Sequence, residues 1–144
     1  MTTPFVPTGI DHIVIWVGDL SAAERWYKSV LGCRDGYAYP DIAMTHLWHG
    51  PVLVGLWDYT SPKAAYAAAA RGAGSRVHHV AFGWQGLSVE DMKHHLDGHG
   101  VAIQKEIKQV GSRGYGTSLY FEDPWDNLIE LKGPAEFQPP SRQD

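Results

Sequence analysis

The sequence predicts an α+β fold of two βαβββ modules that form a curved mixed sheet, a cup, with helices on its outer face. Three observations lead to this prediction: a weak internal repeat, a helix start after the first strand of each copy, and three extended stretches after each helix. Residues 9–27 resemble residues 76–95, and an offset of 67 positions matches His12 with His79. The repeat therefore predicts two copies of one structural unit.

Each copy contains a strand, a short loop and a helix with visible start and stop signals. Ser21 and Ser88 each begin a capping-box pattern, with an acidic residue three positions later. Gly32 is expected to end the first helix, and Gly98 or Gly100 the second. We therefore expect one helix of about three turns in each module.

Turn residues divide the rest of each module into three extended stretches. These stretches cover roughly residues 35–40, 43–49 and 52–58 in the first module, and 101–109, 116–122 and 127–132 in the second. Residues 61–74 between the modules are either a linker helix or a mobile flap over the site. The predicted organisation is an N-terminal arm (1–8), a first module (9–60), the linker or flap (61–74), a second module (75–133) and a flexible tail (134–144).

The composition argues against several classes of function. The net charge is −4 and no basic stretch occurs, which makes a nucleic-acid partner unexpected. No apolar run approaches the roughly 18 residues of a membrane span, and the N-terminus has no signal-peptide core. The single cysteine, Cys33, excludes an internal disulfide and suits the cytoplasm, where we expect the protein. Six tryptophans, seven tyrosines and eight histidines favour a site for a small molecule.

Alternation along each strand indicates which side chains share a face. In residues 76–84, RVHHVAFGW, His79 shares a face with two very small residues, whereas His78 shares a face with larger apolar ones. The small neighbours leave space, so we predict that His79 is the functional histidine. His78 is expected to be structural, on the helix side or at the frayed start of the strand. The same alternation places other polar groups on the open faces of their strands: His12, Ser118, Tyr120 and Glu130.

His12, His79 and Glu130 together predict a catalytic metal centre. The repeat places Gly55 where the first module would supply a fourth ligand, and glycine has no ligand atom in its side chain. A catalytic metal needs three protein ligands and open positions, and two histidines with one carboxylate is a set used by non-haem Fe(II) enzymes. The same set also holds Zn, Mn or Ni. Each of the three could alternatively be an ordinary core or surface residue.

The chain resembles the vicinal oxygen chelate superfamily over about residues 9–133. The similar segments are DHIVIWVGDL, HHVAFGW and, most specifically, YFEDPWDNLIE, which ends at Glu130. The resemblance implies paired βαβββ modules around one divalent metal, with His12, His79 and Glu130 as ligands and Fe(II) favoured. It also implies a homodimer, because chains of this size in the superfamily usually complete their cups by dimerisation.

Within the superfamily, the second half is most similar to the catalytic half of extradiol catechol dioxygenases. This similarity implies that Tyr120 hydrogen-bonds the bound substrate, although Asp126 stands where a glycine is usual. The acid–base histidine of that branch has no clear counterpart, and His46 or His49 could take its place. These two are three residues apart on a strand, so only one can face the cup. The side chains expected to contact the substrate are Trp16, Leu53, Trp57, Ser118 and Arg113, the last as a clamp for a carboxylate on a flexible loop.

The sequence therefore leaves three functions possible, and in each of them the protein binds a small molecule. The first is ring cleavage of a catechol-like compound by an extradiol-type dioxygenase. The second is a glyoxalase- or epimerase-like lyase or isomerase that uses a redox-inert metal. The third is a non-catalytic protein that binds an aromatic ligand. The fosfomycin-resistance branch also matches the metal triad, but it has a polar contact and a lysine where this chain has Val14 and Val110.

Overall fold

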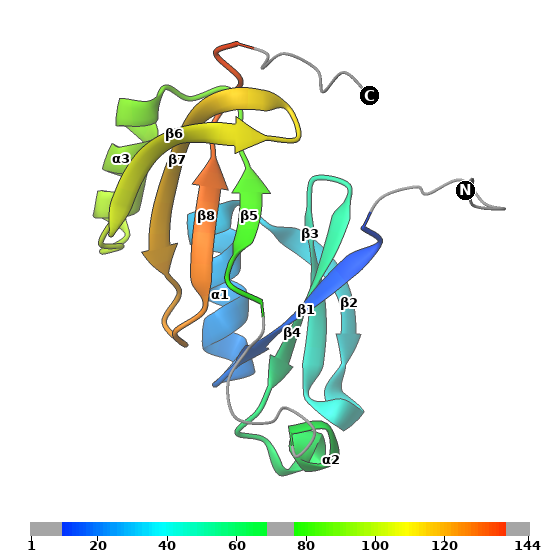
Figure 1. Ribbon diagram of the computed structural model, residues 1–144. Coiled ribbons are helices and arrows are strands. Elements are labelled where there is room, and N and C mark those ends of the chain that lie inside the picture. Colours follow the sequence, from blue (N-terminus) through cyan, green and yellow to red (C-terminus); the bar gives the residue numbers. More distant parts are fainter. Residues whose placement is uncertain (1–9, 69–76, 138–144) are drawn as a thin grey trace, which may run out of the picture. The chain divides into compact units, whose positions relative to one another are not determined.

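The computed structural model describes residues 10–68 and 77–137. The chain forms two compact units, Met1–Arg71 and Gly72–Asp144, and each is described by itself below. Each unit contains one four-stranded mixed sheet with βαβββ connectivity, which confirms the predicted α+β fold class (Figure 1). The sheets are separate, one in each unit. No helix in the described ranges is long and apolar enough to cross a membrane.

The first unit has the strand order β1-β4-β3-β2. β1 pairs parallel with β4, and the other neighbours are antiparallel. A 3-10 turn, η1 (Pro40–Ile42), follows β2, since proline has no N–H to donate to the ladder. The predicted linker begins with η2 (Pro62–Ala64) and α2 (Ala65–Ala68), and its remainder lies outside the described residues. The main elements are β1 (His12–Val17), α1 (Leu20–Leu31), β2 (Arg34–Tyr39), β3 (Met44–His49) and β4 (Val52–Asp58).

The start of α1 differs from the prediction. Asp19, and not Ser21, is the N-cap residue, and its Oδ1 accepts a hydrogen bond from the Ala22 N–H at 3.1 Å. Ser21 lies inside the helix, where its Oγ accepts a hydrogen bond from Arg25. The carboxylate of Asp19 also interacts favourably with the positive end of the helix dipole, which a serine hydroxyl cannot match. Gly32 ends the helix as predicted, with φ 67°.

The second unit repeats this arrangement with the strand order β5-β8-β7-β6. β5 and β8 are parallel, and the other neighbours are antiparallel. Ser88 caps α3 as predicted, and its Oγ accepts a hydrogen bond from the Asp91 N–H at 3.1 Å. The elements are β5 (Val80–Gly83), α3 (Val89–Gly98), β6 (Lys105–Gly111), β7 (Gly114–Glu122) and β8 (Leu128–Lys132).

One face of each sheet forms an apolar core. In the first unit α1 packs against β3 and β4, and Ala23 and Tyr27 of the helix are fully buried. In the second unit α3 contributes Met92 and Leu96. The opposite face of each sheet, called the open face below, carries the polar and aromatic side chains. The buried strand residues of the two cores are Ile15, Val17, Leu47, Val54 and Leu56, and Phe82, Leu119, Phe121, Ile129 and Leu131.

The first part of the predicted flexible tail is bonded to the second sheet. Phe137 forms an antiparallel β-bridge with Tyr115, and their rings stack with centroids 4.7 Å apart. The carboxylate of Glu136 forms an ion pair with Lys108 at 2.6 Å. The predicted N-terminal arm and residues 138–144 lie outside the described part of the chain.

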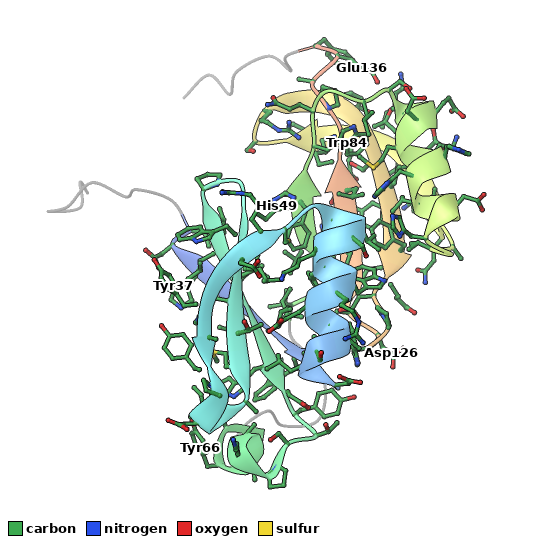
Figure 2. All side chains as sticks on the ribbon, turned by 180° about the vertical axis from the view of Figure 1, so that it is seen from behind. Tyr37, His49, Tyr66, Trp84, Asp126 and Glu136 are labelled. Carbon is green, nitrogen blue, oxygen red and sulfur yellow. The ribbon has the colours of Figure 1, made fainter. Side chains whose placement is uncertain are left out.

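Asp126 adopts a left-handed backbone conformation, φ 65°, in the turn between β7 and β8 (Figure 2). This conformation costs a non-glycine residue about 1–2 kcal/mol, whereas glycine loses about 0.5–1 kcal/mol more chain entropy on folding. We expect Asp126→Gly to raise the free energy of unfolding by about 0.5 kcal/mol, measured by urea denaturation. Asp97→Gly, inside α3, is the control and should lower it by several tenths of a kcal/mol. A loss of stability in both variants would show that Asp126 is not strained.

Candidate metal centre

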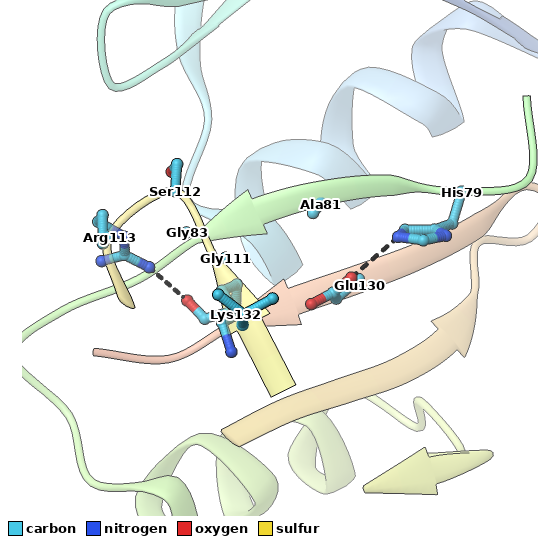
Figure 3. Close-up of a pocket in the computed structure, with 9 residues that line it drawn as sticks. His79, Ala81, Gly83, Gly111, Ser112, Arg113, Glu130 and Lys132 are labelled. Carbon is cyan, nitrogen blue, oxygen red and sulfur yellow. Dashed lines mark hydrogen bonds and ion pairs between the residues drawn. The ribbon is translucent and has the colours of Figure 1, made fainter. Parts of the chain in front are cut away.

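His79 and Glu130 lie next to each other on the open face of the second sheet (Figure 3). Ala81 pairs with Glu130 across the parallel strands β5 and β8, and His79 is two residues before Ala81. His79 Nε2 is 2.9 Å from Glu130 Oε2. The carboxylate is nearly inaccessible to solvent, with 4% of Glu130 exposed. The small Ala81 leaves the space beside His79 that the strand alternation predicted.

Hydrogen-bond donors surround the Glu130 carboxylate. Ser118 Oγ donates to Oε1 at 2.6 Å, and Gln109 Nε2 donates to the same oxygen at 3.0 Å. Tyr120 Oη donates to Oε2 at 2.8 Å. Burial raises the pKa of Glu130, but the hydrogen bonds and His79 outweigh burial and hold this pKa below its ordinary value. The group is therefore an ionised carboxylate, the form that binds metals.

Ser118 and Tyr120 differ in their access to a ligand. Ser118, predicted to contact the substrate, is fully buried, and its hydroxyl orients Glu130. Tyr120 is half-buried, and its ring lies edge-on to His79 with centroids 5.3 Å apart. Burial raises the pKa of the Tyr120 phenol, and the neighbouring Glu130 adds to this effect. Tyr120 therefore keeps its proton and acts as a hydrogen-bond donor.

His78 contacts His79 and does not enter the core. β5 begins at Val80, so both histidines precede the strand, and His78 is exposed. The two Nδ1 atoms are 2.8 Å apart. If His79 donates its Nδ1–H to His78, its Nε2 carries the lone pair that a metal requires. Of the two predicted places, the structure gives the start of the strand, where His78 contacts the ring of His79.

A pocket of about 310 Å³ adjoins His79 and Glu130 within the second unit. This volume falls in the range of small-molecule sites. Two cationic side chains line this pocket: Arg113, at the end away from His79, and Lys132, beside Glu130 (Figure 3). Its lining residues are His79, Ala81, Gly83, Val110, Gly111, Ser112, Arg113, Glu130 and Lys132.

Arg113 lies in the short turn between β6 and β7, but hydrogen bonds hold its side chain. Its guanidinium donates to the backbone carbonyl oxygens of Trp84, Lys132 and Gly133 at 3.0, 2.6 and 3.2 Å. Gly83 leaves room for this approach, because a Cβ there would lie 2.7 Å from Arg113 Nη2. The sequence predicted a clamp on a flexible loop; the structure has a positive charge fixed at the end of the pocket.

The sequence reasoning missed Lys132 and Gln109. Lys132 is two residues after Glu130 on β8, so strand alternation alone could have placed it on the open face. Its ammonium group donates to the Gly116 carbonyl oxygen at 2.6 Å, and burial lowers its pKa. Gln109 could not be found in this way. Its contacts depend on the register between β6 and β7, where Gln109 pairs with Gly116.

In the first unit, His12 and His46 share the open face of the sheet. Gly55 pairs with both Val14 and His46, and the rings of His12 and His46 have centroids 6.4 Å apart. A Cβ on Gly55 would lie 3.1 Å from His46 Cδ2, so the glycine makes room for this ring. His12 Nδ1 is 2.7 Å from the Asp11 carboxylate, which leaves Nε2 available for another contact.

The structure distinguishes His46 from His49. His49 pairs with Val52, two residues before the buried Val54, and therefore lies on the α1 side of the sheet (Figure 2). His46 lies on the open face, and its buried Nδ1 has no hydrogen-bond partner within the described residues. Burial and the nearby His12 lower the pKa of His46, which favours the neutral, proton-accepting form. Of the two predicted acid–base histidines, only His46 faces the side that carries His12.

The lowered histidine pKa values predict a loss of stability in acid. Burial lowers the pKa of His49 below 6.5, its ordinary value, so the unfolded chain binds more protons once the pH falls below that value. The contribution to stability is complete above about pH 6.5 and is lost as the pH falls through the folded pKa. We expect the Tm of the wild type to fall more steeply between about pH 7 and pH 5 than that of His49→Gln. His94→Gln, at an exposed position, should follow the wild type; a parallel profile for His49→Gln would contradict the prediction.

The aromatic residues predicted to contact the substrate lie on the open face of the first sheet. Trp16 pairs with Trp57, and their rings stack at 5.0 Å with an interplanar angle of 13°. The Trp57 indole donates to the Ile42 carbonyl oxygen at 2.8 Å, which fixes its orientation. Leu53 pairs with His12 on the same face. This face offers a flat apolar surface next to two histidines.

The structure brings two of the three predicted ligands together. His79 and Glu130 belong to the second unit and His12 to the first. Within residues 10–68 and 77–137, no three His, Cys, Asp or Glu side chains form a group that could hold a metal ion. A complete triad would take one ligand from the first unit and two from the second, and it stays a prediction.

The fold and the site define a protein of two βαβββ modules with a histidine–carboxylate pair beside a pocket. The chain belongs to the Glyoxalase/Bleomycin resistance protein/Dioxygenase superfamily, whose family model matches residues 9–131. This membership confirms the resemblance inferred from the sequence. A comparison with curated proteins gives no match.

Solved structures of similar fold include proteins of different activities. An integron cassette protein from V. cholerae is 25% identical, with a TM-score of 0.68 over 91% of this chain and 98% of that chain. The fosfomycin resistance protein FosX from Listeria monocytogenes was solved with Mn(II) and a sulfate ion. It is 19% identical, with a TM-score of 0.64 over 91% of this chain and 94% of that chain. Lactoylglutathione lyase from Agrobacterium tumefaciens is 21% identical, with a TM-score of 0.65 over 89% of this chain and 95% of that chain. The last two comparisons show the fold alone.

Proposed function

We propose that this protein is a divalent-metal-dependent enzyme that acts on a small substrate through oxygen atoms of that substrate. The observation that carries the proposal is the His79–Glu130 pair, 2.9 Å apart at the edge of a pocket. In the proposal these two residues and His12 hold the metal. FosX, a protein of the same fold, was solved with Mn(II), which supports a divalent metal in this family.

The donor atoms fit a metal ion. His79 Nε2 and Glu130 Oε2 lie 2.9 Å apart, and an imidazole nitrogen and a carboxylate oxygen are both ligand types that would hold a divalent metal. Glu130 is ionised and held by hydrogen bonds, and His78 can fix the tautomer of His79. Such outer contacts are typical of metal ligands. Two imidazoles and a carboxylate suit Fe(II), Mn, Zn or Ni.

The remaining side chains would bind and orient the substrate. A divalent metal at this site would lower the pKa of a substrate hydroxyl and stabilise negative charge on its oxygens. Tyr120 would donate its O–H to one of these oxygens, and Arg113 and Lys132 make the pocket favourable for an anionic group. The His46 imidazole, whose pKa is lowered by burial and by His12, would accept or return a proton.

Two reaction types fit this proposal. The first is extradiol-type ring cleavage of a catechol-like compound, supported by Tyr120 and by the aromatic face of Trp16 and Trp57. The second is a Lewis-acid reaction without oxygen, by a lyase or isomerase. The cations Arg113 and Lys132 favour the second type, because they suit an acidic substrate more than a neutral ring. Oxygen consumption during turnover distinguishes the two.

The first experiment is the metal content of protein purified without a metal-affinity tag. About one iron or manganese ion per chain would lead to a panel of catechols in an oxygen electrode. Zinc or nickel at that ratio would favour the lyase or isomerase. If no metal binds even after reloading, the enzyme proposal fails and a protein that binds an aromatic ligand remains.

We also propose a homodimer, on the basis of the resemblance. Light scattering on the purified protein tests this directly. A monomer that retains full metal content would show that one chain can complete the site.

A further inference from the structure

We propose that Gln109 is a positioning residue of this site: its amide holds Tyr120 as a hydrogen-bond donor and orients the Glu130 carboxylate. This inference deepens the proposed function and rests on it, because it assumes that Glu130 binds a metal. It also restricts the substrate, as argued below.

Gln109 is placed between the two groups by the register of β6 and β7. It pairs with Gly116, so its side chain lies on the open face together with Ser118 and Tyr120. Its Nε2 is 2.6 Å from Tyr120 Oη and 3.0 Å from Glu130 Oε1. The Glu130 carboxylate can only accept hydrogen bonds, so the amide nitrogen, and not the amide oxygen, must face it.

This contact gives the Tyr120 hydroxyl a direction. A phenol donates one hydrogen bond and accepts others, and the Gln109 N–H occupies an acceptor position on Tyr120 Oη. The O–H of Tyr120 then points to Glu130 Oε2, the oxygen that faces His79. When Oε2 is engaged by a metal, Tyr120 can redirect its O–H to a neighbouring substrate oxygen, while Gln109 still occupies its acceptor side.

The consequence concerns the chemical class of the substrate. Next to Tyr120 the phenol O–H is a donor that a ligand can accept from, because Gln109 Nε2 occupies an acceptor position on its oxygen. The site therefore favours a substrate with a hydrogen-bond acceptor at this point: a carbonyl, carboxylate, alkoxide or phenolate oxygen. A neutral hydroxyl or an amine that must donate a hydrogen bond here would leave its proton unpaired, which is unfavourable when the group is buried.

The packing of β6 does not require glutamine at this position. Gln109 is half-buried on a strand at the edge of the sheet. The Lys132 ammonium group bonds the backbone carbonyl oxygen of Gln109, so this contact survives a change of side chain. Leucine would fill similar space without the two hydrogen bonds, and the amide is needed only for its contacts with Tyr120 and Glu130.

The test compares Gln109→Leu, which removes the donor, with Gln109→Arg, which retains N–H donors. The control is Lys108→Leu. Lys108 is the sequence neighbour of Gln109, and its side chain lies on the opposite face of the sheet. Mn(II) and Zn(II) affinities are measured by calorimetry on the full chain. The C–O stretch of Tyr120 is measured by infrared spectroscopy with labelled tyrosine and assigned with Tyr120→Phe. This band reports whether the phenol accepts a hydrogen bond.

We expect Gln109→Leu to weaken metal binding about 10–100-fold. The C–O stretch of Tyr120 should shift to the frequency of a phenol that donates a hydrogen bond but accepts none. Gln109→Arg should restore the original band because it retains N–H donors, and Lys108→Leu should match the wild type in both band and affinity. Wild-type affinity and an unchanged band in Gln109→Leu would overturn the inference and leave the metal site intact. If the wild type binds neither metal, or His79→Ala binds as well as the wild type, the proposed function itself fails and the inference fails with it.

Discussion

Replacing His79 by alanine is expected to abolish stoichiometric metal binding, whereas replacing the adjacent His78 should only weaken it. His79 Nε2 faces Glu130 Oε2 at 2.9 Å, so its removal leaves the second unit with one of its two proposed ligands. His78 reaches the site only through the Nδ1 of His79, at 2.8 Å. Loss of such an outer contact reduces metal affinity about 10–100-fold, and the loss of a ligand should exceed this.

The measurement is metal content by mass spectrometry after reloading and dialysis, followed by calorimetric titration. His94→Ala, an exposed histidine on α3, controls for the loss of an imidazole elsewhere in the unit. Glu130→Gln should behave like His79→Ala, with Glu122→Gln on β7 as its control. Equal metal loss in His78→Ala and His79→Ala would mean that the two histidines act as one unit. Full retention in His79→Ala would refute the proposed centre.

Phe121→Ala is expected to lower the free energy of unfolding by about 3–5 kcal/mol, the range for deleting a buried phenylalanine. Phe121 is fully buried on β7, and the core around it cannot close over the space of a lost ring. It alternates with Tyr120, which points to the open face. The core defect should therefore leave metal affinity near the wild-type value under conditions where the variant remains folded.

Urea denaturation followed by circular dichroism measures this effect. Phe137→Ala is the matched control, since Phe137 is 55% exposed and contacts the stacked Tyr115. Its loss should cost about 0.5–1.5 kcal/mol. Comparable losses in the two variants would mean that Phe121 is not part of a tightly packed core. A large loss of metal affinity in folded Phe121→Ala would mean that core and site are coupled.

Most of the fold was predictable because it depends on local signals. Period-two alternation placed the strands, and glycine and capping residues placed the helix ends. The capping box at Ser88 was confirmed, whereas the one at Ser21 was wrong because Asp19 offers a competing cap. Both readings used the same local pattern. The structure distinguishes them: at α1 the Asp19 side chain accepts the capping hydrogen bond, whereas at α3 the Ser88 side chain does.

The open faces were predictable for the same reason, and the contacts made on them were not. Alternation placed His79 and Glu130 on open faces, and the structure confirms that they meet. The choice between His46 and His49 required the pairing of β3 with β4. The position of Gln109 required the pairing of β6 with β7, and the carbonyl contacts of Arg113 required β5 and β8 as well.

The sequence by itself determined the two-module plan, the core faces and the strand positions of the candidate ligands, because these follow from the period of a strand and the start and stop signals of a helix. Only the tertiary structure decided which donors reach Glu130, which histidine of β3 lies on the open face and what holds Arg113. These contacts join residues far apart along the chain, and their distances depend on strand register. A shift of one residue would turn each side chain to the other face of its sheet.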